Sequence, residues 1–170
     1  MIETYYDALN QEELNFLNNE CNSFISDEEP SGFDIREKKK NYYFRKFIPE
    51  NKMFCFYDKI LSKLHDKRNI KYHINGIWIN KINSDSNKND KYHQDISDLT
   101  IIIFLNDSFT GGEFEYFDED KKKIKIIPKK NKALVMDNKL VHRILPVTYG
   151  DRFTLVCFFE FDKKEIKSLI

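Results

Sequence analysis

The spacing of hydrophobic residues changes part-way along the chain. Up to about residue 70, apolar residues recur at intervals of three and four, which is typical of amphipathic helices. Beyond that point apolar and polar residues alternate with a period of two, which is typical of β-strands. We therefore predict a helical N-terminal support, residues 1–69, and a β core, residues 70–161.

Two helices are expected in the N-terminal part. Asn10 and Glu13 form a capping box, with Asn10 at the N-cap, which predicts a helix over 11–24. A second apolar stripe predicts a helix over 52–68. An aromatic strand candidate lies at 42–47, and otherwise we expect both helices to precede the strands.

Seven strands are predicted in the β core, and turn residues separate them. We expect hairpins at 110–112, 118–121 and 146–150. Several strands are apolar on both faces, which favours a sandwich or barrel covered by helices. The predicted fold is α+β, mainly β: a double-stranded β-helix (jelly-roll, cupin-like) core flanked by N-terminal helices. With 170 residues and no long linker, we expect one domain over 1–170. The predicted strands are 70–82, 99–105, 113–117, 122–127, 132–136, 139–145 and 152–161.

Charge and cysteine content exclude some classes. The 28 basic residues balance the 28 acidic ones, so no overall charge favours nucleic acid or an acidic membrane. The longest apolar runs, such as 101–105, are too short for a signal peptide or a membrane span. Cys21, Cys55 and Cys157 form no C-x-x-C pair, which disfavours disulfides and thiolate zinc. We expect a soluble protein in the reducing cytoplasm.

His93 and Asp95 are two residues apart. In an extended segment both side chains leave the same face and can converge on one metal ion, although a surface polar pair is the alternative. His142 lies on a later predicted strand, on the same face as Leu140 and Ile144, where a packed core histidine is the alternative. Each residue alone indicates little, but together they supply two imidazoles and one carboxylate.

Arg152 opens the strand after His142, and we expect a hairpin to bring the two together. The alternative is a strand-end arginine that extends to solvent. Two imidazoles and one carboxylate on one side of a metal hold Fe(II) and leave adjacent positions open. A guanidinium in the same cavity can bind the far carboxylate of a dicarboxylate that chelates the metal at its other end. That is the requirement of 2-oxoglutarate.

Four elements occur in a specific order: the H-x-D at 93–95, the strand LTIIIFLN at 99–106, GGE at 111–113 and HRILPVTYGDRFTL at 142–155. This pattern resembles the iron(II)- and 2-oxoglutarate-dependent dioxygenases, within them the prolyl 4-hydroxylase-like branch. The resemblance covers roughly residues 72–161. It implies oxidative decarboxylation of 2-oxoglutarate by O2 to succinate and CO2, coupled to hydroxylation of a C–H bond, with ascorbate as a candidate reductant.

The resemblance also implies roles for individual residues. His93, Asp95 and His142 would bind iron, and Arg152, helped by the Thr154 hydroxyl, would bind the C5 carboxylate of 2-oxoglutarate. Related halogenases have a small residue at the position of Asp95, so the resemblance disfavours halogenation.

The chain departs from its relatives at two places. Many prolyl hydroxylases have a co-substrate-binding tyrosine on the strand before the H-x-D, but none occurs at 77–83 here. Either Asn80 or Trp78 supplies that contact or Arg152 acts with less help, and simple strand packing is the alternative. Phe104 stands where some relatives carry a tyrosine hydroxyl.

The polar loop before the H-x-D borders the active-site mouth in relatives. It is therefore a candidate substrate lid, with a disordered tether as the alternative. The lid candidates are Ser84, Asp85, Asn87 and Tyr92. His65 and His73 lack a partner at metal-ligand spacing and are expected to be structural, and the basic aromatic stretch 38–45 is expected to be a solvated loop beside an edge strand.

The predicted function is hydroxylation of a peptidyl or free amino acid by a prolyl 4-hydroxylase-like dioxygenase that uses Fe(II), 2-oxoglutarate and O2. One alternative is a cupin-like metal-binding or sensing module without turnover. A nucleic-acid demethylase of the same superfamily is disfavoured, because such enzymes usually have a second arginine and none follows Arg152. Neither a nucleic acid nor a membrane is expected as a partner.

Overall fold

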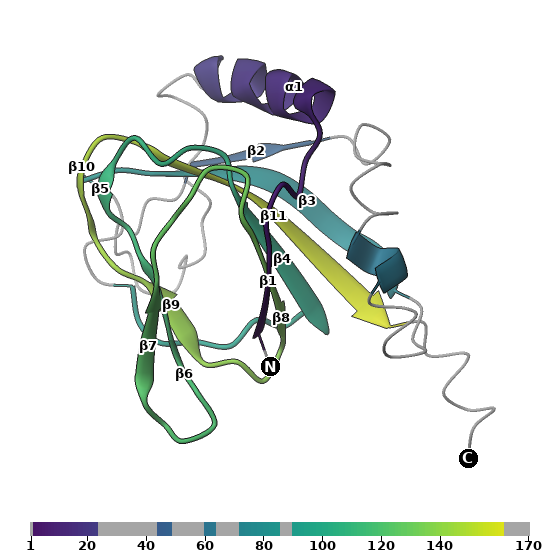
Figure 1. Ribbon diagram of the computed structural model, residues 1–170, viewed down its shortest axis with the longest axis vertical. Coiled ribbons are helices and arrows are strands. Elements are labelled where there is room, and N and C mark those ends of the chain that lie inside the picture. The colour runs from purple at the N-terminus through teal and green to yellow at the C-terminus, as the bar shows by residue number, and fades with distance from the viewer. Residues whose placement is uncertain (1, 24–43, 49–59, 64–71, 86–89, 162–170) are drawn as a thin grey trace, which may run out of the picture.

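Two β-sheets face each other in the computed structural model, which describes residues 2–23, 44–48, 60–63, 72–85 and 90–161 (Figure 1). The large sheet has the strand order β1-β8-β4-β11-β3-β2, the small sheet β7-β6-β9, and β10 pairs with β5. All of the pairings are antiparallel. This arrangement confirms the predicted mainly β jelly-roll core. The strands are β1 (Ile2–Tyr5), β2 (Phe44–Phe47), β3 (Tyr72–Ile82), β4 (Leu99–Phe104), β5 (Thr110–Gly111), β6 (Phe114–Phe117), β7 (Lys123–Ile126), β8 (Ala133–Asp137), β9 (His142–Ile144), β10 (Val147–Tyr149) and β11 (Arg152–Phe161).

The central strands of the large sheet are buried on both faces. In β4 every residue is buried, and alternate side chains enter two separate clusters. Ile101 and Ile103 pack outward with helical residues, whereas Ile102 and Phe104 pack inward against the small sheet. Because side chains alternate along a strand, one face of β4 belongs to a supporting core, the cluster that includes helical residues. The other face belongs to an inner core, the cluster that includes residues of the small sheet. The inner core contains the candidate site.

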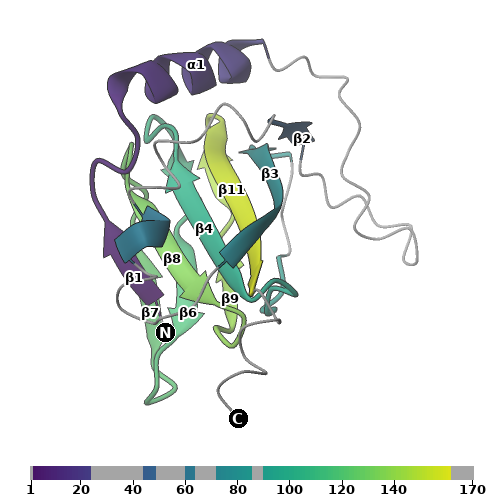
Figure 2. The ribbon, with the colours of Figure 1, turned by 90° about the vertical axis from the view of Figure 1, so that its right-hand side faces the viewer.

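Helix α1 (Gln11–Asn22) lies across one end of the large sheet (Figure 2). The predicted capping box is confirmed: the Asn10 side chain accepts a hydrogen bond from the Glu13 N–H at 2.9 Å, and the Glu13 carboxylate accepts one from the Asn10 N–H at 2.8 Å. Leu17 is fully buried in the supporting core. In the described part of the chain, no helix is long and apolar enough to cross a membrane.

The N-terminal part contributes strands as well as helices. β1 precedes α1 and pairs with β8, so the expectation that both helices precede the strands is wrong. Four residues are too few to give a clear alternating pattern. The strand candidate at 42–47 is confirmed as β2, which pairs with β3. Residues 60–63 are helical, and the rest of the helix predicted at 52–68 lies outside the described residues.

Only one of the three predicted hairpins occurs. The turn at 118–121 joins β6 to β7, as expected. The turns at 110–112 and 146–150 instead connect strands of different sheets, and their residues pair with each other as β5 and β10. Turn residues show where a strand ends but not which strand it pairs with, because pairing depends on contacts far apart in the sequence.

We predict that Leu17→Ala lowers the free energy of unfolding by about 2–5 kcal/mol, because it removes a fully buried side chain from the supporting core. Urea denaturation followed by circular dichroism measures the change. The control Asn19→Ala alters an exposed position of the same helix and should shift stability by at most about 0.5 kcal/mol. Equal effects of the two substitutions would contradict the packing of α1.

Candidate metal and co-substrate site

The structure brings His93, Asp95 and His142 together. The backbone N–H of His93 donates to the carbonyl of His142 and the reverse bond also forms, both at 2.9 Å. One ligand atom from each of the three side chains lies within 4.8 Å of the other two. Nε2 of His93 is 4.0 Å from Oδ1 of Asp95, and Nε2 of His142 is 3.9 Å from Oδ2.

Backbone carbonyls orient the two imidazoles. Nδ1 of His93 contacts the carbonyl of Lys91 at 2.9 Å, and Nδ1 of His142 contacts that of Leu140 at 3.0 Å. Because a carbonyl oxygen only accepts, Nδ1 carries a proton in both rings, and in a neutral ring of this tautomer the lone pair is on Nε2. Burial lowers the pKa of His142, which favours the neutral ring. Backbone partners of this kind fix the tautomer of metal-binding histidines.

The His142 and His93 rings differ in their access to solvent. The His142 side chain is 5% exposed and stacks on Phe114, with 5.0 Å between ring centroids. The His93 side chain is 45% exposed. The cluster is therefore closed on the side of β9 and open on the side of the H-x-D segment, which gives small molecules a route to it.

A pair of buried hydroxyls holds the Asp95 carboxylate. Thr100 Oγ1 donates to Asp95 Oδ2 at 2.7 Å, and Ser97 Oγ lies 3.0 Å from Thr100 Oγ1. Since the single Thr100 proton is directed at the carboxylate, Ser97 donates to Thr100. This chain restrains Oδ2 and leaves Oδ1 directed toward His93. Sequence analysis did not identify Thr100, although its place on the inner face of β4 follows from the alternation.

Arg152 is 1% exposed, so it does not extend to solvent as the alternative supposed. Its Nε donates to the carbonyl of Gly112 at 3.1 Å and its Nη1 to Thr154 Oγ1 at 3.4 Å. Its guanidinium carbon lies 5.2 Å from the centroid of the Phe104 ring, which is a cation–π contact. The hairpin expected to join Arg152 to His142 is absent, because β9 and β11 belong to different sheets.

Gly112 makes room for the arginine. Its φ is +67°, a conformation that favours glycine, and a Cβ there would lie 2.9 Å from Arg152 Cδ. Gly112 therefore serves both as hydrogen-bond acceptor and as the space that the arginine chain occupies.

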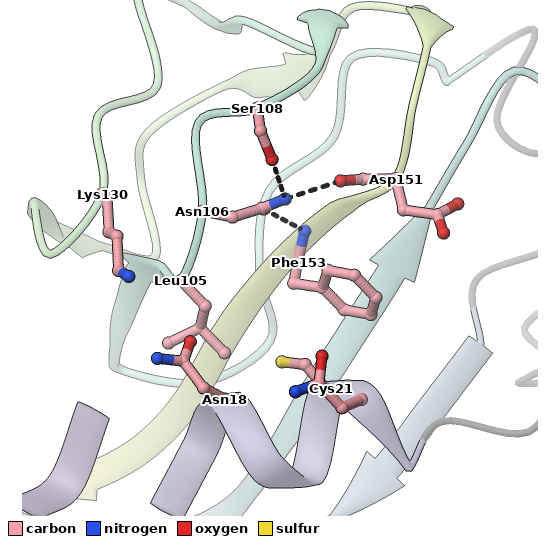
Figure 3. Close-up of a pocket in the computed structure, with 9 residues that line it drawn as sticks. Asn18, Cys21, Leu105, Asn106, Ser108, Lys130, Asp151 and Phe153 are labelled. Atoms are coloured by element: carbon pink, nitrogen blue, oxygen red, sulfur yellow. Dashed lines mark hydrogen bonds between the residues drawn. The ribbon is translucent and has the colours of Figure 1, made fainter. Parts of the chain in front are cut away.

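Asn106 fixes the backbone on both sides of Arg152, as Figure 3 shows. Its Nδ2 donates to the Asp151 carbonyl at 2.8 Å, and its Oδ1 accepts from the Phe153 N–H at 2.9 Å. These bonds tie the end of β4 to the start of β11. Asn106 also lines a cleft of about 450 Å3 beside α1, together with residues such as Lys130 and Phe153. None of the candidate metal or co-substrate residues lines that cleft.

The remaining candidates are less closely joined to the cluster. Trp78 packs edge-on against Phe158 at 4.7 Å. Asn80 lies opposite Thr154 in the sheet, and its buried Oδ1 has no hydrogen-bond partner among the described residues.

Of the lid candidates, Ser84 and Asp85 are exposed, Asn87 lies outside the described residues, and Tyr92 donates a hydrogen bond to Glu115. His73 is on the surface, 3.6 Å from Glu160, and His65 and residues 38–43 lie outside the described residues.

The donor atoms fit a specific metal and a specific co-substrate. Two imidazole nitrogens and one carboxylate oxygen, with open positions, are the typical ligands of non-haem Fe(II) oxygenases. A buried guanidinium beside a hydroxyl fits a carboxylate. The fold and this set of residues therefore define the class of non-haem iron oxygenases.

Comparison of the sequence with protein families leads to the same class. Residues 65–160 match the model of the 2OG-Fe(II) oxygenase superfamily, and the chain belongs to that superfamily. It is a 2-oxoglutarate-dependent oxygenase, and enzymes of this family use Fe(II), 2-oxoglutarate and O2. No curated protein matches the chain in sequence.

Solved structures with the same fold include prolyl hydroxylases. A prolyl-4-hydroxylase from Pseudomonas putida has a TM-score of 0.73 at 14% identity, covering 94% of this chain and 91% of its own. A Trichoplax adhaerens prolyl hydroxylase, in complex with a hypoxia inducible factor oxygen degradation domain peptide fragment, has a TM-score of 0.70 at 18% identity, covering 98% and 86%. HygX from Streptomyces hygroscopicus, with nickel, 2-oxoglutarate and hygromycin B bound, has a TM-score of 0.71 at 12% identity, covering 95% and 83%.

We predict that Thr100→Val weakens Fe(II) binding by about tenfold or more, because the isosteric side chain no longer holds the Asp95 carboxylate. Anaerobic titration with Fe(II) measures the dissociation constant. Thr100→Ser keeps the hydroxyl and should bind Fe(II) nearly as well as the wild type. Thr110→Val, at an exposed position, is the matched control. Unchanged affinity in Thr100→Val would exclude Thr100 from the support of Asp95.

Proposed function

We propose that this enzyme is a prolyl 4-hydroxylase-like dioxygenase that hydroxylates a peptidyl or free amino acid. In this proposal His93, Asp95 and His142 bind Fe(II), and Arg152 with Thr154 binds 2-oxoglutarate. The observation that carries it is the convergence of two imidazole nitrogens and one carboxylate oxygen within 4.8 Å on the inner side of the β core.

When bound, iron and 2-oxoglutarate supply the oxidation: 2-oxoglutarate, O2 and a substrate C–H bond become succinate, CO2 and a C–OH group. The residues of this chain orient the reactants. His93, Asp95 and His142 would hold the metal through three donor atoms, a set that would leave positions for the co-substrate and O2. Related halogenases have a small residue at the position of Asp95, so the carboxylate here supports hydroxylation over halogenation.

The surroundings of Arg152 support the role proposed for it. Its guanidinium is buried in the inner core, where a charged group is stable only with strong partners. Its partners include the Gly112 carbonyl, the Thr154 hydroxyl and the Phe104 ring. In this proposal the planar guanidinium, placed beside the Thr154 hydroxyl, binds the C5 carboxylate of 2-oxoglutarate. Asn80, whose buried Oδ1 lies near Thr154 in the register, and Trp78 remain candidates for a secondary contact.

The class of substrate is inferred from the relatives. Two of the three solved structures described above are prolyl hydroxylases, and one of these contains a peptide fragment. HygX contains hygromycin B, so the same fold also accommodates a small molecule. We therefore propose amino-acid hydroxylation and would test proline-containing peptides before free amino acids.

The first experiment records the anaerobic visible spectrum of the protein with Fe(II), before and after 2-oxoglutarate is added. A weak charge-transfer band in the green should appear with 2-oxoglutarate and should be absent in His142→Ala. Iron binding without this band, and without succinate formation in air with ascorbate as reductant, would instead support a cupin-like metal-binding module.

We predict that Asp95→Ala abolishes succinate formation while the protein remains folded, because it removes the carboxylate from the three proposed metal ligands. Succinate is measured in air with Fe(II), 2-oxoglutarate and ascorbate, and folding by circular dichroism. Asp98→Ala, which removes a carboxylate outside the cluster, is the control. Undiminished turnover in Asp95→Ala would contradict the ligand assignment.

We predict that Arg152→Leu raises the KM for 2-oxoglutarate by about ten- to a hundredfold with a smaller change in kcat, because it removes a charge-assisted binding contact. Arg152→Lys keeps the charge but loses the planar fork and should have an intermediate effect. Lys130→Leu removes a cation from the cleft in Figure 3 and is the matched control. A raised KM in Lys130→Leu alone would place the co-substrate in that cleft.

A further inference from the structure

The segment that contains His93 and Asp95 is not a regular strand. Its only backbone pairing in the described structure is the isolated bridge between His93 and His142. One pair of hydrogen bonds restrains a chain segment weakly, yet metal ligands need to be held to within a fraction of an ångström. Side chains must therefore supply much of the restraint on this segment.

Glu115 and Arg143 lie on the outer face of the small sheet, directly behind the candidate iron ligands. They are opposite each other in the β6–β9 register, and the adjacent pair in that register is Tyr116 with His142. Because side chains alternate along a strand, His142 faces inward whereas Arg143 faces outward. Tyr92, next to His93, reaches the same outer face and meets Glu115.

One carboxylate oxygen of Glu115 joins the three residues. Oε1 accepts a hydrogen bond from the Tyr92 hydroxyl, one from Arg143 Nε at 2.9 Å, and lies 2.7 Å from Arg143 Nη2. The Glu115 side chain is 4% exposed, which strengthens these charge-assisted bonds. The hydrogen bond from Tyr92 lowers the pKa of Glu115, so the group remains a carboxylate at neutral pH.

Ring contacts complete the arrangement. The Arg143 guanidinium carbon lies 4.5 Å from the centroid of the Tyr92 ring, and the Tyr92 and Phe117 rings are 4.6 Å apart. Tyr92 thus extends over β9 to reach β6. The contacts connect the H-x-D segment, the strand that carries His142, and the next strand of the small sheet.

We propose that Tyr92, Glu115 and Arg143, here named the outer clamp, position His93 relative to His142 and so determine the affinity of the site for iron. They are positioning residues, since they act through the ligands and lie on the opposite face of the sheet. The inference rests on the proposed function and assigns Tyr92 to support of the metal site, not to a substrate lid.

The test uses anaerobic Fe(II) titration of folded protein. Glu115→Gln should weaken Fe(II) binding by about ten- to a hundredfold, the range typical of residues that support metal ligands. Tyr92→Phe should have a smaller effect, because Arg143 still holds Glu115. The matched controls Glu119→Gln and Tyr149→Phe alter exposed positions and should bind Fe(II) as the wild type does.

Two further measurements separate positioning from a general structural role. Excess Fe(II) should restore kcat in both clamp variants, and the KM for 2-oxoglutarate should stay within about twofold of the wild type, because Arg152 is untouched. A lower urea midpoint with unchanged Fe(II) affinity would overturn the proposal. A raised KM for a proline-containing peptide that the wild type hydroxylates, with unchanged Fe(II) affinity, would also overturn it and restore Tyr92 as a lid residue.

Wild type and His142→Ala are titrated with Fe(II) in parallel, so that a failure of the outer clamp can be told from a failure of the proposed function. Fe(II) binding that is lost in His142→Ala but unaffected in the clamp variants overturns the outer clamp alone. Wild-type protein that does not bind Fe(II) overturns the proposed function and the clamp together.

Discussion

The pairing of His93 with His142 is the interaction on which the site depends. Two backbone hydrogen bonds of 2.9 Å join a segment before the central strand of the large sheet to a short strand of the small sheet. They place the two imidazole centroids 4.5 Å apart. Asp95, two residues further on, then has its carboxylate within 4.0 Å of both Nε2 atoms. Neither histidine alone distinguishes a metal site from ordinary packing.

Near this pairing, the charged side chains of Asp95 and Arg152 each have specific protein partners. Hydroxyls hold Asp95, and a carbonyl, a hydroxyl and an aromatic ring hold Arg152. Buried polar groups are costly unless they are bonded, so these partners keep the groups in place before any ligand arrives. The same principle operates on the outer face, where Glu115 accepts bonds from two residues, each next to one of the proposed iron ligands. The site is thus held from inside and outside the small sheet.

Much of the local structure was predictable. The capping box at Asn10 and the strands predicted at 99–105 and 152–161 depend on neighbours a few residues away, and they are found as expected, the strands as β4 and β11. The convergence of His93, Asp95 and His142 was also anticipated. The prediction of hairpins at 110–112 and 146–150 was wrong, because local turn signals do not specify a partner strand. The supporting roles of Thr100 and Asn106 were not recognised for a similar reason, since each bonds to a residue that only the fold brings near.

The sequence by itself determined the types of element, the order of the candidate metal ligands and the candidate guanidinium along the chain, and the class of chemistry that they permit. These properties follow from the spacing of hydrophobic residues and from side-chain chemistry, and both depend only on residues that are close together in the sequence. Only the tertiary structure decided that His142 and Arg152 reach the inner core from different sheets, that Gly112 gives the arginine its space, and that Tyr92 is bonded to Glu115. Such contacts depend on how the two sheets pack, and that packing is a property of the whole chain.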